Sequence, residues 1–359
     1  MERRSFLKSA GVGLAAGTAA MPAIAQNMPA IKWRLASSFP KSLDTIYGGA
    51  EFMAKRVAEA TGGKFQIQVF AGGEIVPGPA VFDAVKDLTV EMAHTVSYYF
   101  YGKDPTYAID TTIPFGMNNR QMDAWYRYGN GAKLMGELFA KSNILTIPCG
   151  NTGAQMGGWY RKEIKTPADL KGLKIRIGGF AGAVLTKLGA VPQQIPGGDI
   201  YPALEKGTID AAEWIGPYDD QKLGFNKVAK FYYYPGWWEG GPQVSLYINT
   251  KKWAELPKEY QAILHAACAD AHIDMMAKYD AKNPAALKQL VGSGTQLKQF
   301  PKEVMDACYA AAMELYKETS AANPNFKKVY DDYKKFMDDQ NLWFRIAEGG
   351  FANYMFTKK

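Results

Sequence analysis

The stretch LKGLKIRIGG (170–179) places Arg176 in a short β-strand that runs directly into a glycine turn. Two further segments, GTIDAAEWIGPYDD (207–220) and YYYPGWWEGGPQ (232–243), place Glu213 and Glu239 in polar turns beside tryptophans. Strands that end in such turns are typical of an α/β fold, in which ligands collect at the carboxyl ends of the strands. One arginine with two carboxylates suits the binding of a small acid and a cation, and it suits covalent chemistry poorly.

The remaining sequence alternates strand and helix patterns, which supports the same α/β class. A helix over 43–61 is expected to end at Gly62-Gly63, and a long helix over 257–282 is expected to kink or stop at Asn283-Pro284. Strands are predicted at 31–36, 65–70, 91–95, 144–149, 173–177, 191–195, 209–212 and 244–248. Further helices are predicted at 81–87, 122–140, 182–188, 200–206, 302–318 and 327–338.

The chain length and the lack of a low-complexity linker predict two lobes joined by crossing strands. The first lobe is predicted to comprise 26–153 plus about 242–282, and the second 154–241 plus about 283–322. A helical tail over 323–359 follows and is rich in aromatic residues. Either this tail packs against its own chain, or it docks on a second subunit and forms a homodimer.

The first 25 residues have the pattern of a cleaved export signal. Arg3-Arg4 begins a twin-arginine signature, and a weakly apolar run over 9–21 follows it. Ala23-Ile24-Ala25 is a small-residue site that allows cleavage before Gln26. We therefore predict a twin-arginine signal peptide at 1–25 and a periplasmic location.

Composition argues against several functional classes. The net charge is +7, but the lysines are spread along the chain, so nucleic-acid binding is not expected. The three cysteines lie far apart and form no CxxC motif, and His94, His265 and His272 are also scattered. A periplasmic oxidoreductase that is exported in folded form is the alternative class suggested by the signal, although we find no nucleophile–base pair or cofactor motif for it.

Several motifs together resemble one known family. They are LKGLKIRIGG, GTIDAAEW, GGEIVPGPAVFDAVKDLTVEMAHTVSYY and WWEGG, and with the export signal they cover nearly the whole chain. On these motifs the chain resembles the extracytoplasmic solute receptors of tripartite ATP-independent periplasmic (TRAP) transporters, most closely the 2-oxo acid receptors. The resemblance implies a two-lobed, non-enzymatic binding protein with long C-terminal helices. It implies that a 2-oxo acid such as pyruvate, or a 2-hydroxy acid, binds between the lobes and is delivered to the membrane subunits.

The resemblance also implies roles for individual residues. The carboxylate anchor of the family matches Arg176, although by pattern alone such an arginine more often belongs to an internal ion pair. The sodium ligands match Gln155, Glu213 and Trp214, with Glu239 as a fourth candidate and calcium as the alternative cation. Trp214 can serve a cation only through its backbone carbonyl, because the indole N–H only donates. By pattern alone, both glutamates are better explained as surface or hinge ion pairs.

The other candidates are aromatic and hydroxyl side chains near strand ends. Thr95, Tyr98 and Tyr99 follow a short strand and could supply hydroxyl donors and an apolar wall to the ligand. Phe39 and Phe180 are candidates to cover its alkyl end. Aromatic residues in such loops are also frequent core residues, so packing is the competing explanation for all of them.

A charge count supports the cation. Glu213, Glu239 and a monoanionic ligand carry three negative charges, and Arg176 returns one positive charge, which is costly in a water-poor cleft. One arginine favours a ligand with a single carboxylate. The alternative within the binding class is a receptor for a larger dicarboxylate or an amino-acid-like ligand. The aromatic cluster over 232–238 is expected to pack at the hinge and to close one side of the cleft.

Overall fold

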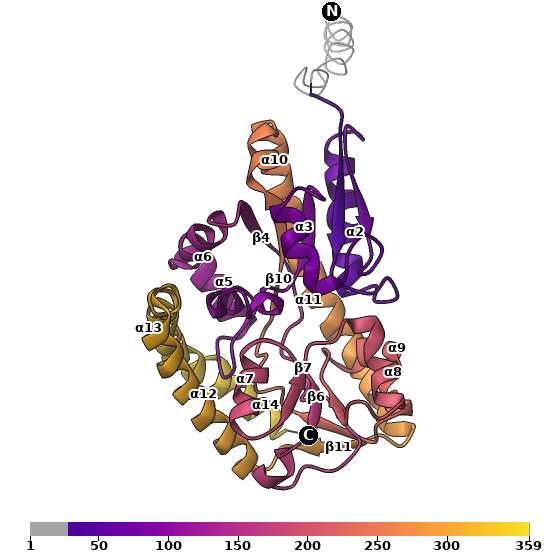
Figure 1. The fold of residues 1–359 in the computed structure, drawn as a ribbon, viewed down its shortest axis with the longest axis vertical. Helices are drawn as coiled ribbons and strands as arrows, with labels where there is room; N and C mark the ends of the chain where they lie inside the picture. The colour runs from indigo at the N-terminus through magenta and orange to yellow at the C-terminus, as the bar shows by residue number, and fades with distance from the viewer. Residues whose placement is uncertain (1–27, 359) are drawn as a thin grey trace, which may run out of the picture.

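The computed structural model describes residues 28–358, and Figure 1 shows two β-sheets surrounded by helices, one above the other in that view. The expected α/β class with two lobes and long C-terminal helices is confirmed. The signal peptide predicted for 1–25 lies outside the described residues. Within them, no helix is both long enough and apolar enough to cross a membrane.

The first sheet has the strand order β2-β1-β3-β10-β4. Strand β1 is parallel to β2 and β3, whereas β10 is antiparallel to β3 and β4. The strands are β1 (Ile31–Ser37), β2 (Phe65–Phe70), β3 (Met92–Thr95), β4 (Ile144–Asn151) and β10 (Gln243–Asn249). β2 alternates buried and exposed side chains at its start, as a strand with one face on the core does.

The helices of this lobe follow the expected signals. α2 ends before Thr61 because Gly62 and Gly63 adopt φ angles of 57° and 79°, which suit glycine. The helices are α2 (Ile46–Ala60), α3 (Val81–Lys86), α4 (Ala108–Thr111), α5 (Asn119–Tyr128), α6 (Gly131–Ala140) and α10 (Thr250–Glu255). Short 3₁₀ turns are η2 (Gly78–Ala80), η3 (Ser97–Phe100) and η4 (Pro105–Tyr107).

The second sheet has the order β11-β9-β5-β8-β6-β7. Strand β6 is parallel to β7 and β8, and β5 is antiparallel to β8 and β9. The strands are β5 (Trp159–Tyr160), β6 (Lys174–Arg176), β7 (Val191–Gln193), β8 (Ala211–Ala212), β9 (Phe231–Tyr234) and β11 (Gln296–Gln299). The helical segments are η5 (Pro167–Leu170), α7 (Gly179–Lys187), η6 (Gly197–Asp199), α8 (Ile200–Glu205), α9 (Pro217–Leu223) and η7 (Phe225–Lys227).

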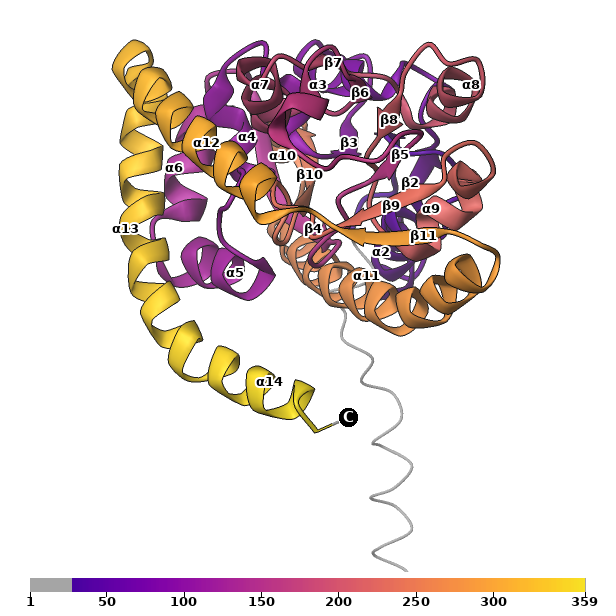
Figure 2. The same ribbon diagram turned by 90° about the horizontal axis from the view of Figure 1, so that it is seen from below.

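One long helix connects the lobes. α11 (Lys258–Gly292) packs against β4 and α2 of the first lobe and against α9 of the second (Figure 2). The chain also crosses between the sheets after β4 and before β10, so the lobes are joined by several segments. All strands of the two sheets fall within the corresponding predicted lobes, but the lobe boundaries themselves stay a prediction.

The chain ends in α12 (Lys302–Ala322), α13 (Pro324–Ile346) and α14 (Glu348–Phe356). Asn323 caps α13 by accepting the backbone N–H of Phe326 at 3.0 Å. The end of α13 and all of α14 extend away from the body of the molecule (Figure 2). This extension exposes apolar side chains, namely Leu342, Trp343, Ile346, Phe351, Tyr354, Met355 and Phe356.

One helix prediction was wrong, and a second helix does not stop where a stop was one of the two expected outcomes. The helix predicted over 122–140 is two helices, because the chain turns at Gly129, which closely approaches the side chain of Trp125. The helix expected to kink or stop at Asn283-Pro284 continues to Gly292 with Pro284 inside it. A contact with α9 supports the helical turn around Pro284, since the Asn283 side chain accepts the backbone N–H of Tyr218 at 3.1 Å.

Candidate functional site

Arg176 lies at the carboxyl end of β6 and only 1% of it is exposed. Its register partner on the parallel strand β8 is Ala212, so the next residue, Glu213, falls beside it. The Nη1 group of Arg176 donates to the Glu213 carbonyl at 2.8 Å and forms an ion pair with the Glu213 carboxylate. Nε donates to the Ile195 carbonyl at 3.2 Å, and Nη2 donates to the hydroxyl of Tyr99 at 3.3 Å. The arginine therefore touches both lobes.

Buried oxygen atoms without partners gather around this arginine. Gln155 Oε1, Glu213 Oε2 and Glu239 Oε2 accept no hydrogen bond from any of the described residues. The backbone joins two of these groups, because the Gln155 N–H donates to the Glu239 carbonyl at 3.0 Å. The ring of Trp214 covers the Arg176 guanidinium at 5.0 Å. Because buried unpaired acceptors are costly, these oxygens are suited to a cation or a proton.

Glycines let the turn that carries Gln155 approach the second sheet closely. Gly158 has a φ of 82°, and a Cβ there would lie 2.7 Å from the carbonyl oxygen of Ala212. The turn is also fixed by backbone hydrogen bonds of 3.0 Å from Gly236 to Gln155 and from Met156 to Ile215. Only glycine combines that φ with so close an approach, which accounts for the Gly-Gly pair before β5.

Burial controls the charge states at this site. Burial raises the pKa of Glu213 to about 7, although the nearby Arg176 opposes the rise. Burial and then the charge of Glu213 raise the pKa of Glu239 well above its usual range. Burial lowers the pKa of Arg176, but the attraction of Glu213 outweighs it, and the net pKa is raised. The two glutamates therefore favour a bound proton unless another positive charge compensates them.

A small cavity with a volume of about 10 Å³ lies next to these groups. Its lining comes from both lobes and consists of Phe39, Ile46, Val96, Tyr98, Tyr99, Thr152, Gln155, Trp214, Ile215 and Pro242. None of these lining residues is charged. Arg176 stands behind the lining, where it contacts Tyr99 and Trp214. This volume has room for about one water molecule and lies far below the roughly 300–1,000 Å³ usual for small-molecule sites, so a ligand can enter only when the surrounding side chains or the lobes move.

The structure brings most of the predicted site residues together. Gln155, Trp214, Tyr98, Tyr99 and Phe39 line the cavity. Three others, Arg176, Glu213 and Glu239, form a buried layer of ionisable groups next to it.

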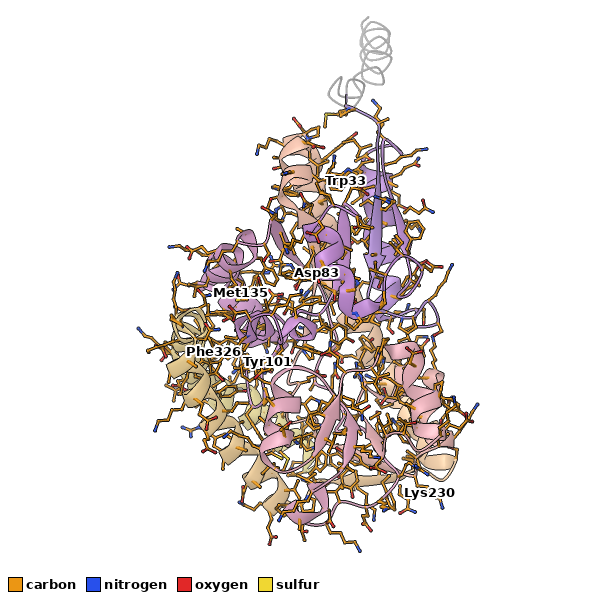
Figure 3. All side chains as sticks on the ribbon, in the orientation of Figure 1. Trp33, Asp83, Tyr101, Met135, Lys230 and Phe326 are labelled. Carbon is orange, nitrogen blue, oxygen red and sulfur yellow. The ribbon has the colours of Figure 1, made fainter. Side chains whose placement is uncertain are left out.

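Two predicted residues lie elsewhere. Thr95 is buried, does not line the cavity, and accepts the Ser38 hydroxyl at 2.7 Å, because its place in β3 turns it into the sheet. Phe180 packs between rings of Tyr101 at 4.9 Å and Phe326 at 5.2 Å, against the C-terminal helices. Figure 3 labels Tyr101 and Phe326, which lie at this contact.

Sequence reasoning missed half of the cavity wall. The missed residues are Ile46, Val96, Thr152, Ile215 and Pro242. Val96 and Ile215 directly follow predicted residues in the chain, so the ends of those two strands carried a usable signal. Ile46 begins α2 far from any predicted ligand group, and nothing in its local pattern marks it.

The aromatic cluster over 232–238 is mainly packing. Tyr232 stacks on Trp159 with 4.1 Å between ring centroids, and Trp237 stacks on Phe115 at 5.3 Å. Trp238 is also buried, and its indole lies where it lowers the pKa of Glu213. The cluster thus supports the layer of charged groups from behind.

The described part of the chain shows no cluster of the side chains that most often hold metals. No three His, Cys, Asp or Glu side chains within it are grouped so that they could hold a metal ion. Cys149, Cys268 and Cys308 are buried and free, so the described residues contain no disulfide.

The comparisons with known proteins agree with this fold and site. Residues 36–323 match the family model described as bacterial extracellular solute-binding protein, family 7. A monocarboxylate 2-oxoacid-binding periplasmic protein of Nostoc sp. is 46% identical over 362 residues, covering 99% of both chains.

Two solved structures extend the comparison. A TRAP transporter solute-binding protein from Bordetella bronchiseptica is 55% identical, with a TM-score of 0.91 over 92% of this chain and 98% of that one. Its structure is a mixed-occupancy dimer with copurified calcium and picolinate in one site. A TRAP periplasmic solute-binding protein from Pseudoalteromonas atlantica, with bound sodium and pyruvate, is 39% identical, with a TM-score of 0.87 over 90% and 98%.

These matches confirm the resemblance to TRAP solute receptors and the expectation that the chain is not an enzyme. They also confirm a periplasmic receptor, while the type of export signal stays a prediction. The chain belongs to the bacterial extracellular solute-binding protein family 7, as a periplasmic solute receptor of the TRAP type.

Proposed function

We propose that this receptor binds a small 2-oxo monocarboxylate, with pyruvate as the leading candidate, together with one cation. The observation that carries the proposal is the buried Arg176 guanidinium beside three unpartnered oxygens of Gln155, Glu213 and Glu239. In this arrangement Arg176 anchors the ligand carboxylate, which takes the place of Tyr99 at Nη2. The 2-oxo acid receptor of Nostoc and the pyruvate-bound Pseudoalteromonas protein support the choice of ligand.

The donor set fits a hard cation. Gln155, Glu213 and Glu239 offer amide and carboxylate oxygens, and the Trp214 carbonyl would complete the set. A cation there supplies positive charge against the two glutamates and can attract both the carboxylate and the 2-oxo oxygen of a ligand. Sodium is the first candidate and calcium the second, since relatives contain one or the other.

A second candidate ligand is an aromatic 2-carboxylate. Phe39, Tyr98 and Trp214 give the cavity aromatic walls, and the Bordetella protein contains picolinate with calcium. A larger dicarboxylate or amino-acid-like ligand is less well supported, because no lining residue is charged to receive a second ionic group.

We further propose that the mature receptor is exported by the twin-arginine route, delivers its ligand to TRAP membrane subunits and forms a homodimer through the C-terminal helices. The exposed apolar side chains at the end of α13 and along α14 support the dimer, because such a surface is unfavourable in water. Light scattering should give twice the mass of the mature chain, and deletion of residues 348–359 should give the monomer. A monomeric intact protein would refute the dimer.

Calorimetry of ligand-stripped protein tests the ligand proposal. Pyruvate should bind in sodium or calcium, and acetate, which lacks the 2-oxo oxygen, should bind at least about tenfold more weakly because it cannot reach both the arginine and the cation. Picolinate tests the second candidate, and succinate tests the dicarboxylate alternative. Affinity for pyruvate that is unchanged after thorough removal of both cations would refute the cation-bridged site.

A further inference from the structure

A cluster of charged and polar groups joins the lobes beside the cavity. Asp44, in the loop before α2 of the first lobe, forms an ion pair with Lys222 of α9. Lys278 of α11 forms a second ion pair with the Asp44 carboxylate at 2.9 Å and donates to its carbonyl at 2.5 Å. The Tyr218 hydroxyl donates to the same carboxylate at 3.2 Å. The contacts with Lys222 and Tyr218 of α9 therefore cross between the lobes, whereas Lys278 lies within the range predicted for the first lobe.

The next residue makes a buried contact of the same kind. Thr45 donates to the Asp219 carboxylate of α9 at 2.5 Å, and Tyr279 of α11 donates to the other oxygen at 2.6 Å. Thr45 and Asp219 are both buried. Both oxygens of Asp219, a second-lobe residue, therefore accept a hydrogen bond, and Thr45 of the first lobe donates one of the two.

This cluster is continuous with the cavity wall. Ile46 directly follows Thr45, and Ile215 precedes α9 by two residues, and both isoleucines line the cavity. Tyr218 at the start of α9 also donates its backbone N–H to Asn283 of α11 at 3.1 Å, so α9 and α11 are tied together. Figure 1 shows α9 below the first lobe and next to α11. A movement that separates Asp44 and Thr45 from α9 therefore acts on chain segments that carry cavity-lining residues of both lobes.

We infer that Asp44 and Thr45 are positioning residues that latch the lobes in the ligand-binding conformation and slow the escape of the ligand. They do not touch the ligand, and they act by holding Ile46 against the second lobe. Exposed ion pairs within one rigid body contribute little to stability. An ion pair between two bodies that must separate shifts the open–closed equilibrium directly, because it exists in one state alone. The inference rests on the proposed ligand-binding role of the cavity.

Dissociation kinetics of pyruvate test the latch. Asp44→Asn keeps the size of the side chain and removes both ion pairs, and Thr45→Val removes the donor to Asp219. Each variant should raise the dissociation rate about 3- to 10-fold with little change in association rate, measured by stopped-flow tryptophan fluorescence. Lys222→Met combined with Asp44→Asn should be less than additive, because the two changes break the same contact.

A matched control is available in the first lobe. Asp83 pairs with Lys103 at 2.8 Å, with side-chain exposures of 44% and 41%, close to the 48% of Asp44. Both control residues lie in the first lobe, and Figure 3 labels Asp83 there. Asp83→Asn should leave both rates unchanged. Equal effects of Asp83→Asn and Asp44→Asn would reduce the result to a general charge effect and overturn the latch.

A ligand-free measurement separates this inference from the proposed function. Spin labels at exposed Lys86 and Lys206, each changed to cysteine, report the distance between the lobes, while the three native cysteines are buried. Asp44→Asn should shift the distance distribution toward longer values without any ligand. If no 2-oxo acid binds, the proposed function fails and this shift still tests the latch. An unchanged distribution in a folded variant would refute the latch.

Discussion

The second lobe contains two pairs of buried carboxylates, Asp219 with Asp220 and Glu213 with Glu239. The pairs differ in whether all of their oxygens accept hydrogen bonds. Asp220 accepts from the Tyr232 hydroxyl at 2.8 Å, from Trp159 Nε1 at 3.0 Å and from a backbone N–H. Its neighbour Asp219 accepts two hydrogen bonds, one at each oxygen. Glu213 and Glu239, by contrast, each keep one oxygen without a partner in the described structure.

The contrast separates structural carboxylates from binding carboxylates. All four are buried, so burial alone identifies neither kind. A fully hydrogen-bonded carboxylate stabilises the fold, and nothing is left for a ligand to satisfy. A carboxylate with an unpaired oxygen costs stability in the free protein, and the cost is recovered when a ligand or cation binds. The comparison predicts that mutations at the two pairs separate stability from affinity.

The largest effect is expected at Arg176, which compensates the binding pair. Arg176→Ala should lower pyruvate affinity by about 2–5 kcal/mol, because it removes the charged partner of the ligand carboxylate. The fold should survive, since Glu213 can take up a proton when its partner is lost. Calorimetry with circular dichroism checks both points. Arg34→Ala is the control, because Arg34 forms a half-exposed ion pair with Glu91 and neither residue lines the cavity. Undiminished affinity in a folded Arg176→Ala protein would remove Arg176 from the anchor role.

Substituting one carboxylate of each pair should have opposite effects on stability and on cation affinity. Asp220→Ala leaves the donors of Tyr232 and Trp159 without a partner and should cost about 2–5 kcal/mol in the free energy of unfolding. Glu239→Gln keeps the size of the side chain and replaces a carboxyl group that burial keeps protonated without a cation, so ligand-free stability should stay within about 1 kcal/mol of the parent or rise. Cation affinity should fall in Glu239→Gln alone. Urea unfolding and calorimetry measure the two quantities, and similar stability losses in both variants would erase the distinction.

The structural pair also predicts a pH dependence of stability. Burial raises the pKa of Asp220 from 3.8 to about 7 and that of Asp219 to about 6. The folded state therefore binds these protons more tightly than the unfolded state, so stability is highest at low pH and falls as pH rises from about 4 to 7. Between pH 5 and 8 the Asp220 contribution is about 2–3 kcal/mol. Asp220→Asn should flatten the curve by this amount, and an unchanged pH slope would show that Asp220 ionises normally.

The sequence predicted the contact at the centre of the site better than its surroundings. Arg176 and Glu213 end adjacent strands, and parallel strands bring their carboxyl ends to one edge, so the general rule for α/β sheets was sufficient. The strand over 65–70 was predicted with its observed bounds because alternation and the preceding Gly-Gly pair both mark it. These features are local or follow from chain order.

What the sequence did not predict depends on contacts between distant segments. β5 has two residues, too few to show a periodic pattern, and β9 and β11 were missed as well. Phe180 was assigned to the cavity because its aromatic character is visible, whereas its packing against Phe326 is not. Asp219 and Asp220 illustrate the same limit, since adjacent aspartates look alike in sequence and only their partners define their roles.

The smallest predicted effect concerns the cation alone. A cation that binds the folded state stabilises it by about 1 kcal/mol when its free concentration is roughly five times Kd. Adding sodium or calcium to ligand-free protein should therefore raise the melting temperature slightly in the parent, and should leave Glu239→Gln unaffected. Asp220→Asn should keep the full cation response, because its oxygens already have protein partners. A cation response that is lost in Asp220→Asn and kept in Glu239→Gln would mean that the two pairs have been assigned the wrong way round.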